Sequence, residues 1–426
     1  MSFLLYFVLP VLLLALGIPI YVILILTAIA GIATTPGLPF SALQTVLFGG
    51  LDSFPLLAVR LFVLAGDIMG QGGLAKRMIA WAMSMIGGIR GSLALTTIAS
   101  SELFGAMSGS AVGCVAAIGR LLFPSLRDGG YGQTFAVGII ASSGAIAVII
   151  PPSIPMIIYG ISAQQSVPAL FLAGVLPGLL IGLLASVYVL IHARLKLVPL
   201  TSKARWRNIV DTTKDASWSI GAPAVILGGI YGGIFTPTEA AGVAVVYAAL
   251  VSRYIYREVT WADLWKITQN SMYLVAQLMV IVAAAGAYSW LITTSGFPQH
   301  LVTVIEGLHL QTWVMLLSFN LLLLVVGSFL EPPAAILILT PLFMPLVHAA
   351  GIDPVHFGII MTVNLAIGMF TPPFGLNLFA AHALFRVPLP QIYRGVLPFI
   401  LIYLIALLLI TFVPAISLAP LALLKP

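Results

Sequence analysis

Small polar residues interrupt four otherwise apolar stretches of this chain, in a pattern that suits the binding of a metal cation. Where a helix is broken, backbone carbonyl oxygens lose their helical partners, and neighbouring Ser, Thr and Asn side chains add further neutral oxygens. Such oxygens can together replace the hydration shell of an ion. The start of a half-helix also carries a partial positive charge that suits a carboxylate. The four interruptions are Ser108-Gly109-Ser110, Ser142-Ser143-Gly144 before Pro151-Pro152-Ser153, Glu331-Pro332-Pro333, and Asn364 before Thr371-Pro372-Pro373-Phe374-Gly375-Leu376-Asn377.

These interruptions predict two related sodium sites, with the solute held between the tips at Ser108-Gly109-Ser110 and Glu331-Pro332-Pro333. A plainer interpretation is that Pro and Gly only kink the helices and that Ser bonds to its own backbone. The repetition of the whole constellation favours ion binding. We predict sodium ligands at Ser108, Gly109, Ser110, Ser143, Gly144 and Pro151 for the first site and at Glu331, Asn364, Thr371 and Gly375 for the second, and solute contacts at Ser110, Ser153, Pro332, Pro373 and Asn377.

Ionisable residues inside apolar stretches are a further group of candidates, because charge is costly in a membrane. Glu331 is the strongest, since it lies at an interruption. Glu239 is equally suited to the first turn of a helix, and Glu102 suits a buried, hydrogen-bonded support. Arg60 and Asp67 are two helical turns apart on one face and suit pairing with another helix or with a partner subunit.

The composition indicates which elements must position these residues. Hydrophobic residues make up 61% of the 426-residue chain and charged residues only 7%, whereas about a quarter of a soluble domain is charged. The chain is therefore an integral membrane protein. Its continuous apolar runs lack alternating polarity, so we predict an all-α polytopic membrane protein and not a barrel.

A pattern of Gly and Pro residues occurs twice in the sequence, about 221 residues apart. Gly138-Ile-Ile recurs as Gly358-Ile-Ile, Pro151-Pro152 as Pro372-Pro373, and Gly174-Val-Leu-Pro177 as Gly395-Val-Leu-Pro398. Repeats of interrupted apolar segments are typical of transporters whose site lies between two halves. We predict an inverted repeat with re-entrant hairpins at about 93–123 and 313–347 and broken helices at about 131–162 and 354–385; two ordinary kinked helices are the alternative for the hairpins.

Basic residues predict the sides of the membrane, because cytoplasmic loops collect Lys and Arg. The segment before the first hairpin holds Lys76, Arg77 and Arg90, whereas residues 297–310 before the second hold neither Lys nor Arg. Residues 194–218 should then be cytoplasmic and the C-terminus outside, and 203–217 suits a surface helix or a bare loop. We predict scaffold helices over 1–72, a first repeat over 73–192, a basic cytoplasmic segment with central scaffold helices over 193–295, a second repeat over 296–417 and a tail over 418–426.

Several function classes have no support in the sequence. The formal charge of +6 is explained by cytoplasmic loops without any nucleic acid. There is no phosphate-binding loop for ATP, the six histidines lack metal-ligand spacing, and the single Cys114 excludes a disulfide framework. The apolar run to Ala33 is longer than a signal-peptide core, and it forms either one tilted span or two shorter pieces.

At these residues the sequence resembles the large membrane subunit (DctM type) of TRAP transporters, the tripartite ATP-independent periplasmic systems. The resemblance covers essentially the whole chain. Its most specific stretches are Ser108-Gly-Ser-Ala111, Ile150-Pro-Pro-Ser-Ile-Pro-Met156, Tyr231-Gly-Gly-Ile-Phe-Thr-Pro-Thr-Glu-Ala-Ala-Gly242, Pro333-Ala-Ala-Ile-Leu-Ile-Leu-Thr-Pro341 and Gly351-Ile-Asp-Pro-Val-His-Phe-Gly358 leading into Asn364 and Thr371-Pro-Pro373.

The resemblance implies an elevator-type, sodium-driven importer of organic acids in the bacterial inner membrane. It also implies two separate partners, a small four-helix membrane subunit and a soluble periplasmic substrate-binding protein. The chain departs from the family pattern in three places. Cys114 stands where members often have Asp, Arg60 replaces a common Pro, and the stretch Thr293–Gly296 lacks an Arg found in some relatives, which weakens any assignment of the solute carboxylate to a fixed cation.

Three other interpretations remain at this stage. A self-sufficient ion-coupled carboxylate carrier would show similar interruptions but transport without a binding protein. A channel would pass a continuous current. A membrane enzyme would need Ser110, Glu331 and His382 to meet, and no motif in the sequence brings them together.

Overall fold

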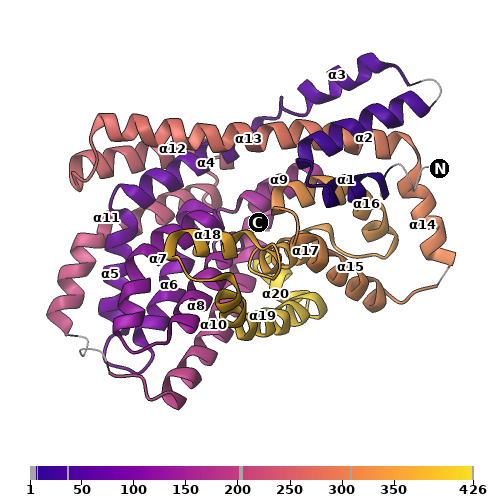
Figure 1. Cartoon of the computed structure of the whole chain (residues 1–426). Helices are drawn as coiled ribbons and strands as arrows, with labels where there is room; N and C mark the ends of the chain where they lie inside the picture. Colours follow the sequence, from indigo (N-terminus) through magenta and orange to yellow (C-terminus); the bar gives the residue numbers. More distant parts are fainter. Residues whose placement is uncertain (1–5, 7, 36–37, 201–204, 308, 425–426) are drawn as a thin grey trace.

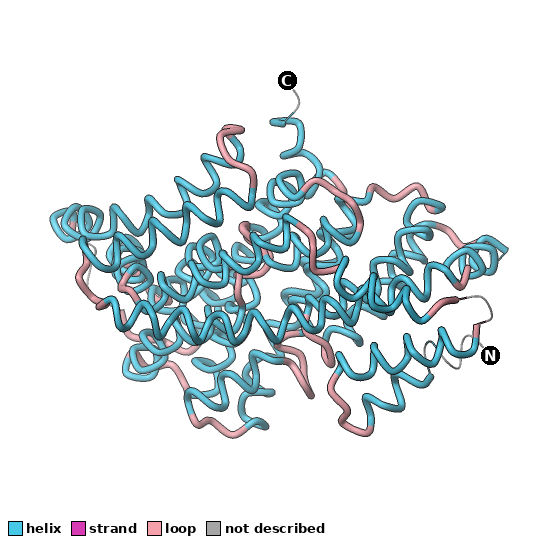
Figure 2. The backbone as a smooth tube through the Cα atoms, turned by 90° about the horizontal axis from the view of Figure 1, so that it is seen from above, coloured by secondary structure: helices cyan, strands magenta, loops and turns pink. Residues whose placement is uncertain are grey.

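The protein is a bundle of helices. The structure, a computed structural model, describes all residues except 1–5, 7, 36–37, 201–204, 308 and 425–426. Every regular element in this described part is helical, as the tube in Figure 2 shows. Six of these helices are long and apolar enough to cross a membrane: α4 (Phe54–Gln71), α10 (Val167–Leu195), α12 with its π-helical end η2 (Pro237–Ile255), α13 (Trp261–Thr294), α16 (Pro332–Ala349) and α19 (Leu389–Phe412). The expected all-α polytopic fold is confirmed.

The N-terminal apolar run forms two helices rather than one. A break at Gly17, whose φ is +77°, and at Pro19 separates them. Glycine adopts this left-handed backbone conformation without the steric clash that a side chain would cause. These first helices, with the third, are α1 (Leu9–Ala15), α2 (Ile20–Thr34) and α3 (Phe40–Gly49).

The first half of the molecule contains a hairpin and a broken helix. The chain turns at Gly109, between α6 and α7, and these two helices pack against each other. The next apolar stretch is broken at residues 147–153, between α8 and the short helix α9, and the long helix α10 follows α9. The elements of this half after α4 are α5 (Leu74–Ile86), α6 (Ser92–Ser108), α7 (Ala111–Asp128), α8 (Gln133–Ile146), α9 (Ile154–Ser162) and α10.

The second half repeats this order of helices with bounds shifted by about 221 residues. Its hairpin differs in packing, because α15 lies mainly against α17 and α16 mainly against α13 and α9. Figure 1 shows α5 and α14, which correspond by this shift, at opposite ends of the molecule. The remaining elements are α14 (Phe297–Gly307), α15 (Thr312–Gly327), α17 (Pro354–Gly368), α18 (Leu376–Phe385), α20 (Ala415–Leu418) and the 3-10 helix η3 (Ala419–Leu424).

The two halves pack across each other in the middle of the bundle. Helix α7 of the first hairpin lies against α18 of the second broken helix, and α16 of the second hairpin lies against α9 of the first broken helix. Helices α8 and α19 approach so closely that a Cβ atom on Gly138 would lie 2.1 Å from the carbonyl oxygen of Gly395. Neither half can therefore form its site alone.

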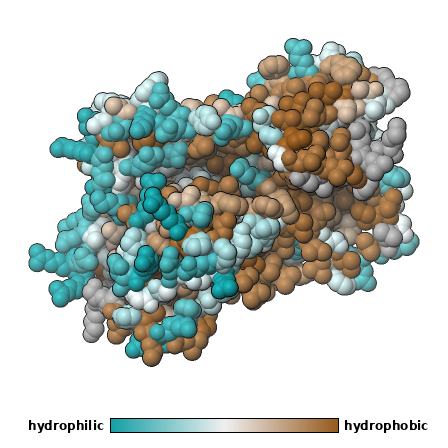
Figure 3. Space-filling model, in the orientation of Figure 1, coloured by the Kyte–Doolittle hydropathy of each residue, from teal (hydrophilic) through white to brown (hydrophobic). Residues whose placement is uncertain are grey.

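One end of the molecule is polar. Helix α11 (Trp206–Tyr231) continues without a break from the basic segment into an apolar stretch, so 206–217 is helical; residues 203 and 204 lie outside the described residues. In Figure 3, hydrophilic residues gather at the end where Figure 1 shows α5 and α11. Arg77 of α5 joins this end together, with Asp215 of α11 at 3.2 Å and Glu258 at 2.6 Å.

Candidate functional site

The tip of the first hairpin lies against the break in the first broken helix. Gly109 has a φ of +58°, and a Cβ atom there would lie 2.5 Å from the carbonyl oxygen of Pro152. The side chain of Ser110 caps α7 by accepting the Gly113 N–H at 3.2 Å, and Ser108 is buried. Two segments that the sequence predicts to share a site are thus in contact.

The end of α8 meets the start of α7 and one residue of the other half. A Cβ atom on Gly144 would lie 3.1 Å from the carbonyl oxygen of Ala111 and 3.4 Å from Nδ2 of Asn377. Ser143, beside it, is buried. Ser153 caps α9, where its hydroxyl accepts the Met156 N–H and donates to the carbonyl oxygen of Val148.

Asn377 of α18 connects the two halves and has one buried oxygen without a partner. Its Nδ2 donates to the carbonyl oxygen of Ala141 at 2.9 Å, which assigns the other amide atom as Oδ1. Within the described residues, Oδ1 has no hydrogen-bond partner, although the residue is fully buried. The hydroxyl of Tyr403 likewise donates to the carbonyl oxygen of Ser142 at 2.8 Å.

The second broken helix contains a matching buried amide, Asn364. Its Nδ2 donates to Oδ1 of Asn320 and to the carbonyl oxygen of Ile360, both at 2.8 Å. Asn320 in turn donates to Oγ1 of Thr411 at 3.0 Å. Oδ1 of Asn364 is buried and has no partner in the described part of the chain.

The break that follows Asn364 is compact. The hydroxyl of Thr371 donates to the carbonyl oxygen of Ile367 at 2.7 Å, and the Gly375 N–H donates to the carbonyl oxygen of Thr371 at 3.1 Å. The end of α15, the first helix of the second hairpin, packs closely against the end of α17, since a Cβ atom on Gly368 would lie 2.2 Å from the carbonyl carbon of Gly327. Both broken helices also contain a cis peptide bond between their paired prolines, Pro151-Pro152 and Pro372-Pro373.

Glu331 is placed differently from the other predicted sodium ligands. It precedes α16, whose first residue is Pro332, and its side chain is exposed and makes no capping hydrogen bond. No hydrogen bond among the described residues joins its carboxylate to Asn364 or Thr371. Nearby, the rings of Phe329 and Phe374 lie 5.3 Å apart and join this hairpin tip to the loop that contains Pro373.

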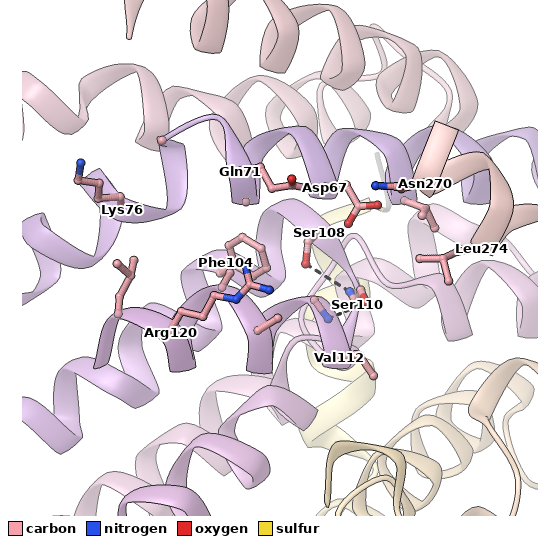
Figure 4. A pocket seen from close by; sticks show the side chains of 18 of the residues that line it. Asp67, Gln71, Lys76, Phe104, Ser108, Ser110, Val112, Arg120, Asn270 and Leu274 are labelled. Atoms are coloured by element: carbon pink, nitrogen blue, oxygen red, sulfur yellow. Dashed lines mark hydrogen bonds between the residues drawn. The ribbon is translucent and has the colours of Figure 1, made fainter. Parts of the chain in front are cut away.

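A cavity of about 710 Å³ lies beside the tip of the first hairpin. Its walls come from α4, α7 and α13, with Ser108 and Ser110 of the tip among the lining residues. Figure 4 shows Asp67 and Asn270 toward one end of it and Lys76 toward the other. The cavity therefore connects the hairpin tip with the beginning of α5.

The other ionisable candidates have separate environments. Glu239 forms a capping box with Thr236, which accounts for it structurally. Asp67 accepts a hydrogen bond from Ser271 of α13 at 2.5 Å. Nε of Arg60 is buried and has no partner within the described residues.

Glu102 and His382 also lie apart from the two broken helices' amides. Glu102 points at Gly182 of α10, since a Cβ atom on that glycine would lie 1.5 Å from Oε1. His382 contacts the carbonyl oxygen of Val387 at 2.7 Å through Nδ1. No hydrogen bond in the described part of the chain links His382 with Ser110 or Glu331.

The arrangement suits a hard monovalent cation. Carbonyl, hydroxyl and amide oxygens are the ligands that such ions prefer, and buried polar atoms are nearly always partnered in proteins. The unpartnered Oδ1 atoms of Asn364, on α17, and Asn377, beside Gly144 of α8, are two of several exceptions among the described residues. Each of these two oxygens is free to act as a ligand of a cation.

Sequence reasoning missed several residues that support these amides. Asn320 and Thr411 complete the network around Asn364, and Tyr403 bonds the first broken helix. Asn320 had a readable signal, because it is a polar residue in the middle of the apolar run of α15. Lys76 and Arg120 line the cavity, whereas the sequence suggested for Lys76 only a cytoplasmic position before the first hairpin.

Hairpins and broken helices inside a multi-pass bundle place the chain among the polytopic helical membrane proteins. The solved structure of the Alcanivorax borkumensis YdaH transporter has the same fold, with a TM-score of 0.64 and 17% identity over 95% of this chain and 98% of that one. Residues 7–416 match the family described as the DctM component of the tripartite ATP-independent periplasmic transporters. The chain belongs to this family, and the resemblance seen in the sequence is confirmed.

Two relatives show the range of names in the family. The C4-dicarboxylate TRAP transporter large permease protein DctM of Pseudomonas aeruginosa is 42% identical, over 89% of this chain and 88% of its own length. The ectoine TRAP transporter large permease protein TeaC of Halomonas elongata is 38% identical, over 95% and 96%. The chain is thus a multi-pass inner-membrane permease of a tripartite system, and its relatives are transporters rather than enzymes.

Proposed function

We propose that this permease imports an organic acid with the energy of a sodium gradient, by an elevator-type movement of its hairpins and broken helices. The observation that carries the sodium assignment is the pair of buried, unpartnered amide oxygens on Asn364 and Asn377. A cation that bound them would satisfy both atoms, at two places that correspond in the two halves.

The proposed solute site lies between the hairpin tips, and its chemistry favours a carboxylate. Helix N-termini at Ser110 and Ser153 present partially positive N–H groups. A relative named for C4-dicarboxylates supports this class of solute, whereas a relative named for ectoine shows that the family alone does not fix it.

Coupling between ion and solute follows from the cross-packing of the halves. An ion bound beside Gly144 would draw together the tip of the first hairpin, the first broken helix and Asn377 of the second. A protein that is ordered in this way binds its solute better, so the ion shifts the population toward the solute-competent state. Movement of the hairpins with the bound ions and solute would then carry all of them across.

The proposed partners are a small four-helix membrane subunit and a periplasmic binding protein that delivers the solute. Family membership in a tripartite system supports both. A carrier that works alone is the competing possibility. The two differ in whether the binding protein is required.

The test is uptake into proteoliposomes of defined composition. The permease and its small subunit are reconstituted, and labelled succinate, as a C4-dicarboxylate probe, is added with the binding protein under an inward sodium gradient. A parallel screen by the shift in melting temperature of the binding protein, over a panel of organic acids, supplies the probe if succinate is not bound. We expect uptake only with sodium and the binding protein. Uptake driven equally by potassium would refute the sodium assignment, and equal uptake without the binding protein would support the self-sufficient carrier.

A further inference from the structure

Two cations from different elements line the cavity beside the first hairpin tip. Lys76 belongs to the first turn of α5 and Arg120 to α7, and both line the same space of about 710 Å³. Both residues are exposed. In Figure 4, Lys76 lies toward one end, Asp67 and Asn270 toward the other, and Arg120 between them.

The two cations differ in their ion pairing: Arg120 has no partner in the described part of the chain, and Lys76 has one long, exposed ion pair with Glu258. Within the described residues, the Arg120 side chain has no hydrogen bond and no ion pair. Nζ of Lys76 is 3.7 Å from Oε1 of Glu258, and its side chain remains 66% exposed. The same oxygen is bound at 2.6 Å by Arg77, which also bonds Asp215. Glu258 also lines this end of the cavity, but it is shared between Arg77 and Lys76, so the basic side chains here outnumber the acidic ones.

The acidic lining residue at the other end is engaged separately. Asp67 accepts the hydroxyl of Ser271 at 2.5 Å and lies near the tip, where a Cβ atom on its neighbour Gly66 would be 2.7 Å from Cβ of Ser108. An anion that left the hairpin tip would therefore pass from neutral serine oxygens toward the unpaired Arg120 and the loosely paired Lys76. A local excess of one sign of charge concentrates ions of the opposite sign.

We propose that Lys76 and Arg120 form an anion-binding exit site, which accepts the carboxylate of the solute as it leaves the first hairpin tip for the cytoplasm. The inference rests on the proposed function, because it takes the solute to be an organic acid moving inward. Guanidinium and ammonium groups bind carboxylates through charge-assisted hydrogen bonds. The two side chains come from α5 and α7, so they hold an anion only while these helices keep the cavity between them.

The transport test compares Arg120→Gln, Lys76→Gln and the charge-preserving Arg120→Lys in the complete reconstituted system. Lys214→Gln is the matched control, because Lys214 is an exposed basic residue of α11 that does not line the cavity. We expect each charge-removing variant to lower Vmax/KM for solute efflux from the cytoplasmic side about fivefold. Thermodynamics fixes the ratio of Vmax/KM for uptake to Vmax/KM for efflux, so Vmax/KM for uptake should fall by the same factor. Because the external KM should not change, this fall should appear in the Vmax of uptake. Arg120→Lys should retain most activity, and variants that behave like Lys214→Gln would overturn the proposal.

A binding measurement separates this site from the proposed function. Val112 lines the same cavity, so Val112→Cys in a Cys114→Ala background can carry an environment-sensitive fluorophore there. Succinate titrated onto the complex in neutral lipid at low salt should change the fluorescence, and Arg120→Gln should abolish the change even if the native protein fails to transport with sodium. Absence of a response to succinate in the native complex refutes the site. A response that phosphatidylglycerol vesicles alone suppress would assign the cations to lipid headgroups and overturn the exit role.

Discussion

Replacement of Asn364 by Leu should remove sodium-dependent stabilisation of the protein. The substitution keeps the branched shape and the number of heavy atoms of the side chain but deletes two hydrogen bonds and the unpartnered Oδ1 atom. Each bond contributes about 1 kcal/mol, and the Oδ1 atom of Asn320 that is left behind costs about 1–3 kcal/mol. The substitution also removes the buried, unpartnered Oδ1 atom of Asn364, and this gain offsets the cost of leaving Oδ1 of Asn320 without a partner. Without sodium the net loss of stability should therefore be about 2 kcal/mol.

Sodium makes the difference larger. An ion bound only by the folded state at 100 times its dissociation constant adds about 2.7 kcal/mol of stability. The variant should lose most of this increment in stability, or should need at least tenfold more sodium to reach half of the increment. A tenfold weaker affinity for sodium corresponds to about 1.4 kcal/mol of binding free energy. The assay is the melting temperature followed by intrinsic tryptophan fluorescence in detergent, in sodium and in potassium chloride at equal ionic strength.

Asn320→Leu is the matched control for this measurement. It breaks the same bond with Asn364, and also the bond to Thr411, but it leaves Oδ1 of Asn364 in place. It should lower the melting temperature in both salts and keep the sodium increment. If Asn364→Leu retains the increment as fully as Asn320→Leu does, Oδ1 of Asn364 is not a sodium ligand.

Three further outcomes are expected. In a Cys114→Ala background, a membrane-impermeant thiol reagent added outside should label Ala422→Cys and spare Arg207→Cys, both exposed positions; the reverse pattern would invert the topology. Glu331→Gln should lower sodium-driven uptake at least tenfold without loss of assembly, whereas Glu239→Gln should weaken only the cap of α12 and leave uptake unchanged; unchanged uptake by Glu331→Gln would make that acid structural. Uptake should rise sigmoidally with sodium, and Ser110→Ala should raise the half-maximal concentration; a Hill coefficient near one and one-to-one stoichiometry would leave only one coupled ion.

The positions of the helix breaks were readable from the sequence because Gly and Pro act on the backbone locally. Gly109 adopts a left-handed conformation at the turn, and α9 begins directly after Pro151-Pro152-Ser153. Ser110 and Ser153 cap the helices that follow, as their positions after the breaks suggest. The Glu239 cap at Thr236 was foreseen for the same reason.

Contacts between distant segments could not be read in this way. Nothing around Asn377 in the sequence indicates that its amide bonds Ala141, 236 residues away. The cavity depends on α4, α7 and α13 coming together, so the free charge of Arg120 appears only in three dimensions. Glu331 illustrates the converse: its position before Pro332 was correctly expected at a tip, but its exposed side chain sets it apart from the buried amide of Asn364.

The cross-packing of the halves gives a physical reason why the two proposed sodium sites should bind cooperatively. Asn377, in the second broken helix, donates to the first broken helix and lies beside Gly144. Tyr403, from α19 of the second half, bonds the carbonyl oxygen of Ser142. An ion that ordered the first break would therefore fix groups of the second half as well, and the next ion would meet a partly ordered protein. The second ion would then bind with a smaller loss of conformational entropy than the first, which is a source of positive cooperativity between sites.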